Sequence, residues 1–240
     1  MRLHHLRREC GCYPDPGADD GRKPYFTRGT PHDEILEHDY TVTVPDFFID
    51  EAQVSNAEFD RFLKASGYQP EHQENFLRHW PDGVMPPEIA DLPVVYVDLD
   101  DARAYARWAG KRLPNEAEWQ RAAQGDDGLL WPWGNDFDPA KCASAASGPL
   151  PVRSLPEGRG PNGLYHTCGN VWEWTESEYD DGHTRFCIIR GGSWYQPSGS
   201  GWYAPAGPQP LNTHTKFLLL WPGLDRCATI GFRCVKDATS

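Results

Sequence analysis

Turn-forming residues divide the second half of this chain into short pieces. Beyond Gly125, glycine, proline and asparagine recur every few positions, as in the run from Gly160 to Gly163. Glycine and proline are the strongest local signals for turns, and at this density they exclude long helices and long strands. We therefore expect only short strands in this half, at residues 172–175, 186–191 and 229–235.

The first half of the chain has a different pattern, with capped amphipathic helices. Ser55 and Glu58 have the spacing of a capping box, apolar residues then recur at helical spacing, and Gly67 is suited to end the helix. These signals predict a helix over residues 56–66. The same reasoning predicts two further helices, one over 99–109 and one from Asn115 to about Gln124.

A half-buried strand is expected before the first helix, within residues 39–50, because Tyr40, Val42 and Val44 alternate with polar residues. Residues 1–39 are polar, rich in glycine and proline, and without a sustained period, so we interpret them as an irregular N-terminal arm. The sequence shows no internal repeat and no long linker after this arm. We therefore predict one α+β domain over residues 40–240.

Composition and charge exclude several classes of protein. Twenty-three basic residues stand against thirty-five acidic ones, and a formal charge of −12 argues against a nucleic-acid partner. The longest apolar run, residues 217–221, is far shorter than a membrane span, so we expect no membrane partner. The basic N-terminus lacks the apolar stretch of a secretory signal. Seven cysteines at low density form no disulfide pattern, and together these features predict a cytoplasmic protein.

Four segments of the chain carry a family resemblance. They are residues 48–59, residues 93–119, residues 163–174, and residues 190–194 together with the closing stretch 231–235. In this order they resemble the formylglycine-generating enzyme, or sulfatase-modifying factor, family. The resemblance covers roughly residues 40–236 and implies an irregular fold of the C-type-lectin kind, with few helices, short antiparallel strands and long loops.

The resemblance also identifies what this chain lacks. Formylglycine-generating enzymes hold copper on two cysteines, three and eight residues after the serine of a Gly-Gly-Ser motif, and Cu(I) prefers such thiolates. Counted from Ser193, these positions hold Gln196 and Gly201. We therefore expect a divergent member that does not activate sulfatases by copper and cysteine chemistry. Thiol oxidation at another cysteine is the least favoured alternative: Cys187, Cys227 or Cys234.

A calcium site is implied by the same resemblance. Residues 165–173 match a family loop in which backbone carbonyls and a carboxylate bind Ca²⁺, an ion that prefers oxygen ligands. Carried over, Gly169 and Val171 offer carbonyls, Glu173 offers a carboxylate, and His166 replaces an asparagine ligand. The alternative is that Glu173 accepts hydrogen bonds from the loop and binds no ion.

Residues 191–215 contain no Asp, Glu, Lys or Arg, although a quarter of the chain is charged. Long ordered loops are often functional, and aromatic side chains suit a sugar ring or a peptide. The alternative is that these aromatics cover a thin core. The candidate ligand-binding residues are Trp172, Trp194, Tyr195, Trp202 and Tyr203.

His214 and Lys216 follow at the end of this run, before the apolar stretch 217–221. A histidine and a lysine at the edge of a pocket suit a general base and an electrostatic clamp, or a metal site. With Ser193 and Gln196 they form the candidate catalytic set. The alternative is that His214 is a hydrogen-bonded structural residue.

Two functions remain open from the sequence. The first is a metal-dependent oxidoreductase that uses molecular oxygen, with iron or copper held by histidine and carboxylate. The second is a non-catalytic lectin-like module that binds a small molecule, a peptide or a carbohydrate through its aromatic loop. Neither the substrate nor the oligomeric state follows from the residues.

Overall fold

The computed structural model describes residues 3–6, 10–11, 41–144, 147–180, 182–183, 185–195, 207–219, 223 and 225–238. Their α-helices are α1 (Asn56–Ser66), α2 (Leu99–Trp108) and α3 (Glu116–Gln124), and short 3₁₀ helices lie at η1 (Pro81–Gly83), η2 (Pro87–Ile89), η3 (Pro139–Lys141) and η4 (Pro156–Gly158). The strands are β1 (Leu3–Leu6), β2 (Cys10–Gly11), β3 (Thr41–Val42), β4 (Phe47–Asp50), β5 (Trp172–Asp180), β6 (Arg185–Arg190), β7 (His214–Leu218), β8 (Ile230–Gly231) and β9 (Val235–Asp237).

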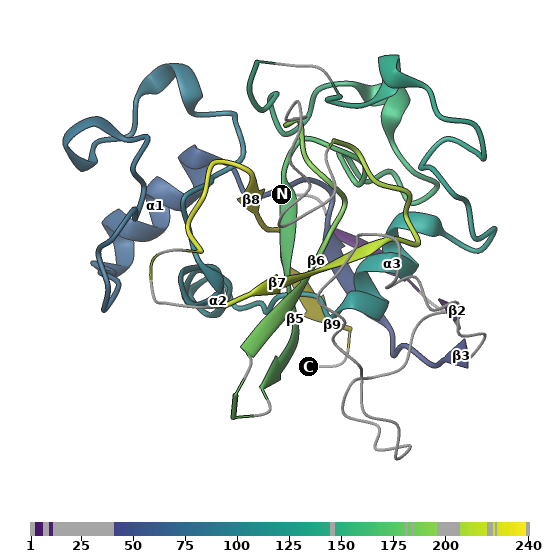
Figure 1. Cartoon of the computed structure of the whole chain (residues 1–240), viewed down its shortest axis with the longest axis horizontal. Coiled ribbons are helices and arrows are strands. Elements are labelled where there is room, and N and C mark those ends of the chain that lie inside the picture. Colours follow the sequence, from purple (N-terminus) through teal and green to yellow (C-terminus); the bar gives the residue numbers. More distant parts are fainter. Residues whose placement is uncertain are drawn as a thin grey trace.

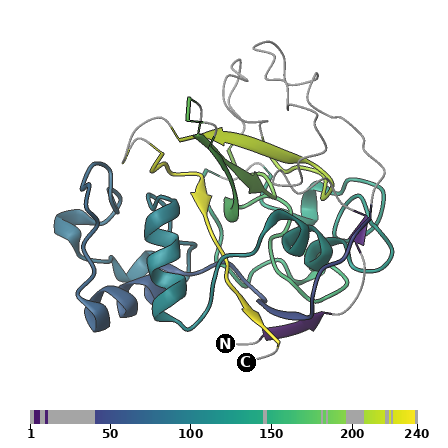
Figure 2. The ribbon, with the colours of Figure 1, turned by 90° about the horizontal axis from the view of Figure 1, so that it is seen from below.

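The strands form a central sheet, a smaller sheet and a short ribbon. The central sheet has the order β7-β6-β5-β8, with β8 parallel to β5 and the other neighbours antiparallel. The smaller sheet has the order β1-β4-β9, so strands from the two ends of the chain flank β4 (Figure 2). β2 pairs with β3. In Figure 1, α1 and α2 lie together to the left of the central sheet, and α3 lies to its right.

All three predicted helices are present, because their signals are local. Each begins with a capping box, and α1 ends at Gly67, whose φ of 66° is the left-handed conformation that glycine adopts easily. At α2 the box is formed by Asp98 and Asp101, whose side chains each accept the other's backbone N–H at 2.9 Å. The helices and the mixed sheets confirm the predicted α+β class.

The strands differ more from the predictions. The strand predicted within 39–50 is divided into β3 and β4 around Pro45, which has no N–H to donate to a ladder. The strand predicted over 229–235 is likewise divided into β8 and β9, and Arg233 between them turns into the interior. Strand β7 was not predicted. In the arm predicted to be irregular, β1 and β2 pair with β4 and β3.

The main hydrophobic core lies between α1, α2 and the central sheet. Phe59 of α1 stacks on Tyr105 of α2 with ring centres 5.8 Å apart, and Phe232 meets the edge of both rings. Trp174 of β5 is fully buried and donates its indole N–H to the carbonyl of Val97 at 3.0 Å. A smaller cluster packs under β4 and β9. No helix among the described residues is both long enough and apolar enough to cross a membrane.

Gly158, at the end of η4, lies against the backbone of η3. A Cβ at this position would sit 1.9 Å from the carbonyl oxygen of Lys141, a contact that only a backbone shift can relieve. We expect Gly158→Ala to lower the free energy of unfolding by about 1–3 kcal/mol, as overpacking does. Gly148→Ala is the control, because a Cβ there meets nothing within 4 Å. Urea unfolding compares the two, and equal stabilities would contradict the predicted clash.

Candidate functional site

A cleft of about 570 Å³ opens beside the N-terminal end of α2. Its walls come from residues 68–72, from α2 and its cap, from the start of β6, and from Leu219, Asp225 and Arg226, and we call it the Asp225 cleft. Small-molecule sites in proteins have volumes of about 300–1,000 Å³, so this cleft has the size of a ligand site. Its charged lining residues are Glu71, Asp98, Asp100, Asp225, Arg107, Arg185 and Arg226.

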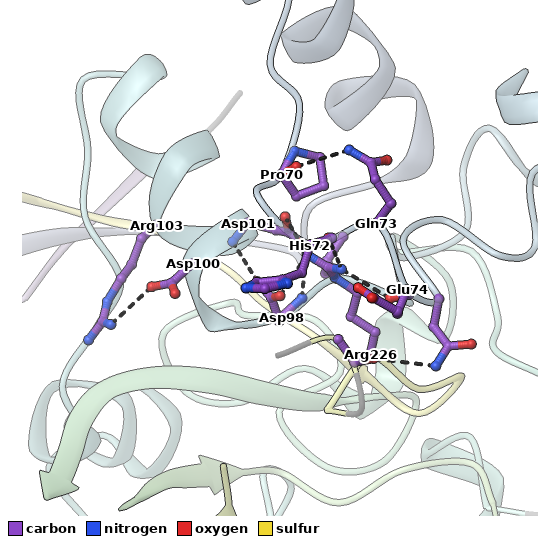
Figure 3. Close-up of polar contacts among 12 residues, drawn as sticks. Pro70, His72, Gln73, Glu74, Asp98, Asp100, Asp101, Arg103 and Arg226 are labelled. Carbon is purple, nitrogen blue, oxygen red and sulfur yellow. Dashed lines mark hydrogen bonds and ion pairs between the residues drawn. The ribbon is translucent and has the colours of Figure 1, made fainter. Parts of the chain in front are cut away.

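Arg226 is buried on one side of the cleft and is held by two carboxylates of the α2 cap (Figure 3). Its Nε donates to Asp101 Oδ2 at 2.8 Å, and its Nη2 lies 2.7 Å from Asp98 Oδ2 and 3.2 Å from Asp101 Oδ1. Burial and the neighbouring charge of Asp98 raise the pKa of Asp101, while Arg226 opposes this shift. The guanidinium therefore compensates the buried Asp101 and the partly buried Asp98 at once.

The remaining donors of Arg226 hold the loop around residues 72–74, which continues from another wall of the cleft. Nη1 donates to the carbonyl oxygens of His72 at 2.6 Å and Glu74 at 3.0 Å, so the arginine ties this loop to α2 (Figure 3). The guanidinium also lies 5.2 Å from the centre of the Phe76 ring, a cation–π distance. All five N–H groups of Arg226 are thus engaged within the protein, and the residue is not available to a ligand.

Asp225 is the group in the cleft whose interactions are incomplete. Its Oδ1 atom is buried and has no hydrogen-bond partner among the described residues. Burial raises the pKa of this carboxyl, and the nearby charge of Asp98 raises it further. Buried polar atoms in native proteins are nearly always satisfied, so an orphaned carboxylate oxygen beside a cleft indicates a place for a ligand.

Strained backbone lies next to this cleft. Leu77 and Tyr96 both have positive φ values, 47° and 56°, which are rare for residues with large side chains. They are bonded to each other, from Leu77 N–H to the Tyr96 carbonyl at 3.0 Å, and Tyr96 N–H donates to the carbonyl of Cys227, the neighbour of Arg226. Strain of this kind persists where the surrounding structure requires it, often at binding sites.

The residues that the sequence named lie elsewhere. Glu173 is fully buried in β5, and its two oxygens accept four hydrogen bonds. Arg233 donates to both oxygens at 2.7 Å, Trp119 Nε1 donates to Oε2 at 2.7 Å, and Gln53 Nε2 donates to Oε1 at 3.0 Å. This arrangement is the one expected if Glu173 accepts hydrogen bonds within the protein and binds no ion.

Two other members of the implied calcium site, His166 and the Val171 carbonyl, are also engaged. The ring of His166 contacts the Ser154 hydroxyl and the Pro151 carbonyl, and burial lowers its pKa to about 4. The Val171 carbonyl accepts from Gln53, and Gly169 N–H donates to the Gly191 carbonyl. Because a guanidinium already neutralises Glu173, the described donors do not suit a divalent cation. Calcium binding stays a prediction of the resemblance.

Two of the predicted catalytic residues, His214 and Lys216, lie on β7 of the central sheet. His214 of β7 is opposite Arg190 of β6, and its Nδ1 lies 3.9 Å from Glu116 Oε2. Burial, together with the charges of Arg190 and Lys216, lowers the pKa of His214 to about 3. Two cations beside a histidine are unfavourable to a redox metal. No group of three or more His, Cys, Asp or Glu in the described part of the chain is arranged to hold a metal.

The aromatic candidates are only partly described. Trp172 is buried in the core, Ser193 is buried, and Trp194 and Tyr195 meet edge to face, with Tyr195 half exposed. Gln196, Trp202 and Tyr203 lie outside the described residues. The sequence reasoning missed the Asp225 cleft. The one available signal was Asp98-x-x-Asp101 at the start of the predicted helix. Asp225 was considered only as one possible metal partner of His214, and nothing in the sequence places it in a cleft.

Comparison with known proteins gives a consistent family. The family model described as the sulfatase-modifying factor enzyme 1-like domain matches residues 25–238. Serine/threonine-protein kinase Pkn1 of Chlamydia trachomatis is 34% identical over 88% of this chain and 37% of that protein. The inactive C-alpha-formylglycine-generating enzyme 2 of Bos taurus is 41% identical over 45% of this chain and 40% of that protein. The formylglycine-generating enzyme of Thermomonospora curvata is 37% identical over 67% of this chain and 65% of that protein.

The chain therefore spans between about a third and two thirds of the length of these relatives. Two solved structures share its fold at low sequence identity. PvdO from Pseudomonas aeruginosa gives a TM-score of 0.61 at 23% identity, over 99% of this chain and 92% of that one. CarF gives a TM-score of 0.60 at 22% identity, over 83% of this chain and 88% of that one.

The two readings of Glu173 predict different responses to calcium. Glu173→Gln keeps the shape of the side chain but leaves the buried Arg233 without its counter-charge, which typically costs about 3–5 kcal/mol. We expect this loss of unfolding free energy to be the same with calcium and with a chelator. Glu176→Gln, more exposed on the same strand, is the control and should cost less than about 1 kcal/mol. If the loss of unfolding free energy caused by Glu173→Gln disappears when a chelator removes calcium, Glu173 is instead a calcium ligand.

Proposed function

Because the chain belongs to the sulfatase-modifying factor family, we propose that it is a ligand-binding domain of that family, and that its Asp225 cleft takes a cationic group, an ammonium or a guanidinium. The observation that carries this proposal is the buried Oδ1 of Asp225, which has no partner among the described residues. A ligand cation placed beside it would supply the missing donor and the missing charge.

The arginines of the cleft support a cationic ligand, because two of the three are already paired. Arg226 is engaged by Asp98 and Asp101, and Arg185 is paired with Glu178. Burial raises the pKa of Asp225 and the charge of Asp98 adds to this shift, while Arg226 and Arg185 oppose it. Because both arginines are already paired with other carboxylates, a ligand cation would be the direct partner of the Asp225 carboxylate. A carbohydrate, which carries no cation, would leave this charge uncompensated. Among the partner classes considered from the sequence, a small amine or a basic peptide side chain fits best.

We also infer that the domain is not a copper-dependent sulfatase activator. The support is the pair Gln196 and Gly201 at the positions where the family resemblance expects the copper-binding cysteines. Soft Cu(I) is held poorly by an amide and not at all by a glycine side chain. The similarity to a protein named an inactive formylglycine-generating enzyme agrees with this inference.

The iron- or copper-dependent oxidoreductase stays a second hypothesis, and elemental analysis tests it. Because the donors around His214 do not suit a metal, we expect the purified protein, after anaerobic incubation with Fe(II) or Cu(I) and desalting, to retain much less than one metal per chain. The His214→Ala variant should then retain as little metal as the parent protein. One metal per chain, lost in His214→Ala, would favour the oxidoreductase over a simple binding domain.

The cation proposal predicts selective peptide binding. Labelled peptides of the form Gly-Gly-X-Gly-Gly, blocked at both ends, are titrated with the protein and followed by fluorescence anisotropy. We expect binding when X is arginine or lysine and none when X is norleucine or glutamate. Removing the charge with Asp225→Asn should weaken binding about ten- to a hundredfold, the value of a charge-assisted hydrogen bond. Asp136→Asn, in an exposed loop outside the cleft, should leave it unchanged.

Stability and pH distinguish this role from a structural one. A carboxyl whose pKa is raised in the folded state contributes stability at low pH that is lost as pH rises through that pKa. Unliganded Asp225→Asn should therefore be at least as stable as the parent at pH 7. Peptide binding should weaken as pH falls toward the raised pKa. A clearly less stable variant, or equal binding of the norleucine peptide, would contradict the proposal.

A further inference from the structure

Two cysteines that no reading of the sequence connected lie side by side in the structure. Cys142 follows η3, and Cys168 lies in the loop before β5. Both are buried, with 5% and 1% of their surface exposed, and neither is in a disulfide. The two thiols act on each other's pKa, since Cys168 lowers the pKa of Cys142 and Cys142 raises that of Cys168.

The backbone explains why the two thiols meet. Ala143 and Gly169 form a parallel β-bridge, so Cys142 and Cys168 each precede a bridged residue and point to the same face. Adjacent strands lie about 4.8 Å apart, which is within the 4.4–6.8 Å that separates the Cα atoms of a disulfide. The approach is close here, since a Cβ on Gly169 would lie 2.9 Å from the Ala143 carbonyl oxygen.

The other described thiols are placed differently. Cys187 is fully buried and its thiol contacts the carbonyl oxygen of Thr175 at 3.2 Å. Cys227 contacts the Thr229 hydroxyl, and Cys234 is fully buried in the main core. Among the described residues, none of these three thiols contacts another cysteine.

We propose that Cys142 and Cys168 are a redox-active pair, which a small-molecule disulfide such as oxidised glutathione converts to an intramolecular disulfide. Cys142, the more exposed of the two, loses its proton and attacks one sulfur of the oxidant, which releases one reduced thiol. Cys168 then loses its proton and attacks the Cys142 sulfur, which releases the second. The two protein thiols give up two protons and two electrons, and one oxidant molecule becomes two thiols.

The new bond would act on the loop that supports the Gly-Gly-Ser segment. Gly169 N–H donates to the Gly191 carbonyl and Trp194 N–H donates to the Asn170 carbonyl, both at 2.8 Å. A bond at Cys168 would therefore fasten the η3 segment to the support of residues 191–194. It would also close the chain over residues 143–167, which restricts the unfolded state and stabilises the fold. This proposal does not depend on the Asp225 cleft.

The test uses the full chain equilibrated anaerobically with mixtures of reduced and oxidised glutathione. After acid quenching and alkylation, intact mass and non-reducing peptide mapping identify the products. We expect a monomer lighter by two hydrogens, with a single cross-link between the peptides of Cys142 and Cys168. Its melting temperature should rise by several degrees over the reduced form.

Single variants separate this pair from the other thiols. Cys142→Ser and Cys168→Ser should lose the cross-link, and in each the remaining thiol should carry one glutathionyl group. Cys227→Ser should keep the cross-link and is the matched control. Two alkylatable thiols at 142 and 168 in fully oxidised, folded protein, or a cross-link that maps to another pair, would overturn the proposal. If a serine variant does not fold, the peptide map of the parent chain decides alone.

Discussion

The ion pair between Glu173 and Arg233 joins parts of the chain that are distant in the sequence. Both side chains are fully buried, and removing two charges from water costs several kcal/mol for each ion. The cost is offset because no donor or acceptor of the pair is left unused. Arg233 also donates to the carbonyl of Tyr165 at 2.7 Å and, at 3.4 Å, to those of Asp50 and Glu51. Trp119 brings α3 to the same carboxylate. This one network therefore connects β4, β5, α3 and the segment that leads into the last strand.

A second buried arginine obeys the same rule beside the Asp225 cleft. Arg226 is compensated by the α2 cap and by the carbonyls of residues 72 and 74, just as Arg233 is compensated by Glu173. Its neighbour Asp225 is the exception, because one buried oxygen has no partner among the described residues. Next to an arginine whose five N–H groups are all engaged, an orphaned carboxylate oxygen is informative. It points to function because the fold gains nothing from leaving a carboxylate in this state.

The sequence predicted the parts of this structure that depend on neighbours in the chain. The capping box at Ser55 and the left-handed glycine after α1 are local, and both were read correctly. Strand β7 was missed because its partner β6 lies far back in the chain, and pairing cannot be read from composition. The network of Glu173 was open to two readings, since only the folded chain places Arg233 against it. The same holds for Asp225, which is marked by what surrounds it in space.

The two proposals rest on different parts of the fold and can fail separately. The Asp225 cleft is set by α2, by the loop that Arg226 holds, and by the start of β6. The cysteine pair is set by the bridge between Ala143 and Gly169, beneath residues 191–194. The Glu173 network, with its four hydrogen bonds to the carboxylate, involves neither feature. A buried network of this kind keeps the fold while the chemistry elsewhere on it changes. This accounts for a family member that retains the fold and lacks cysteines where copper would bind.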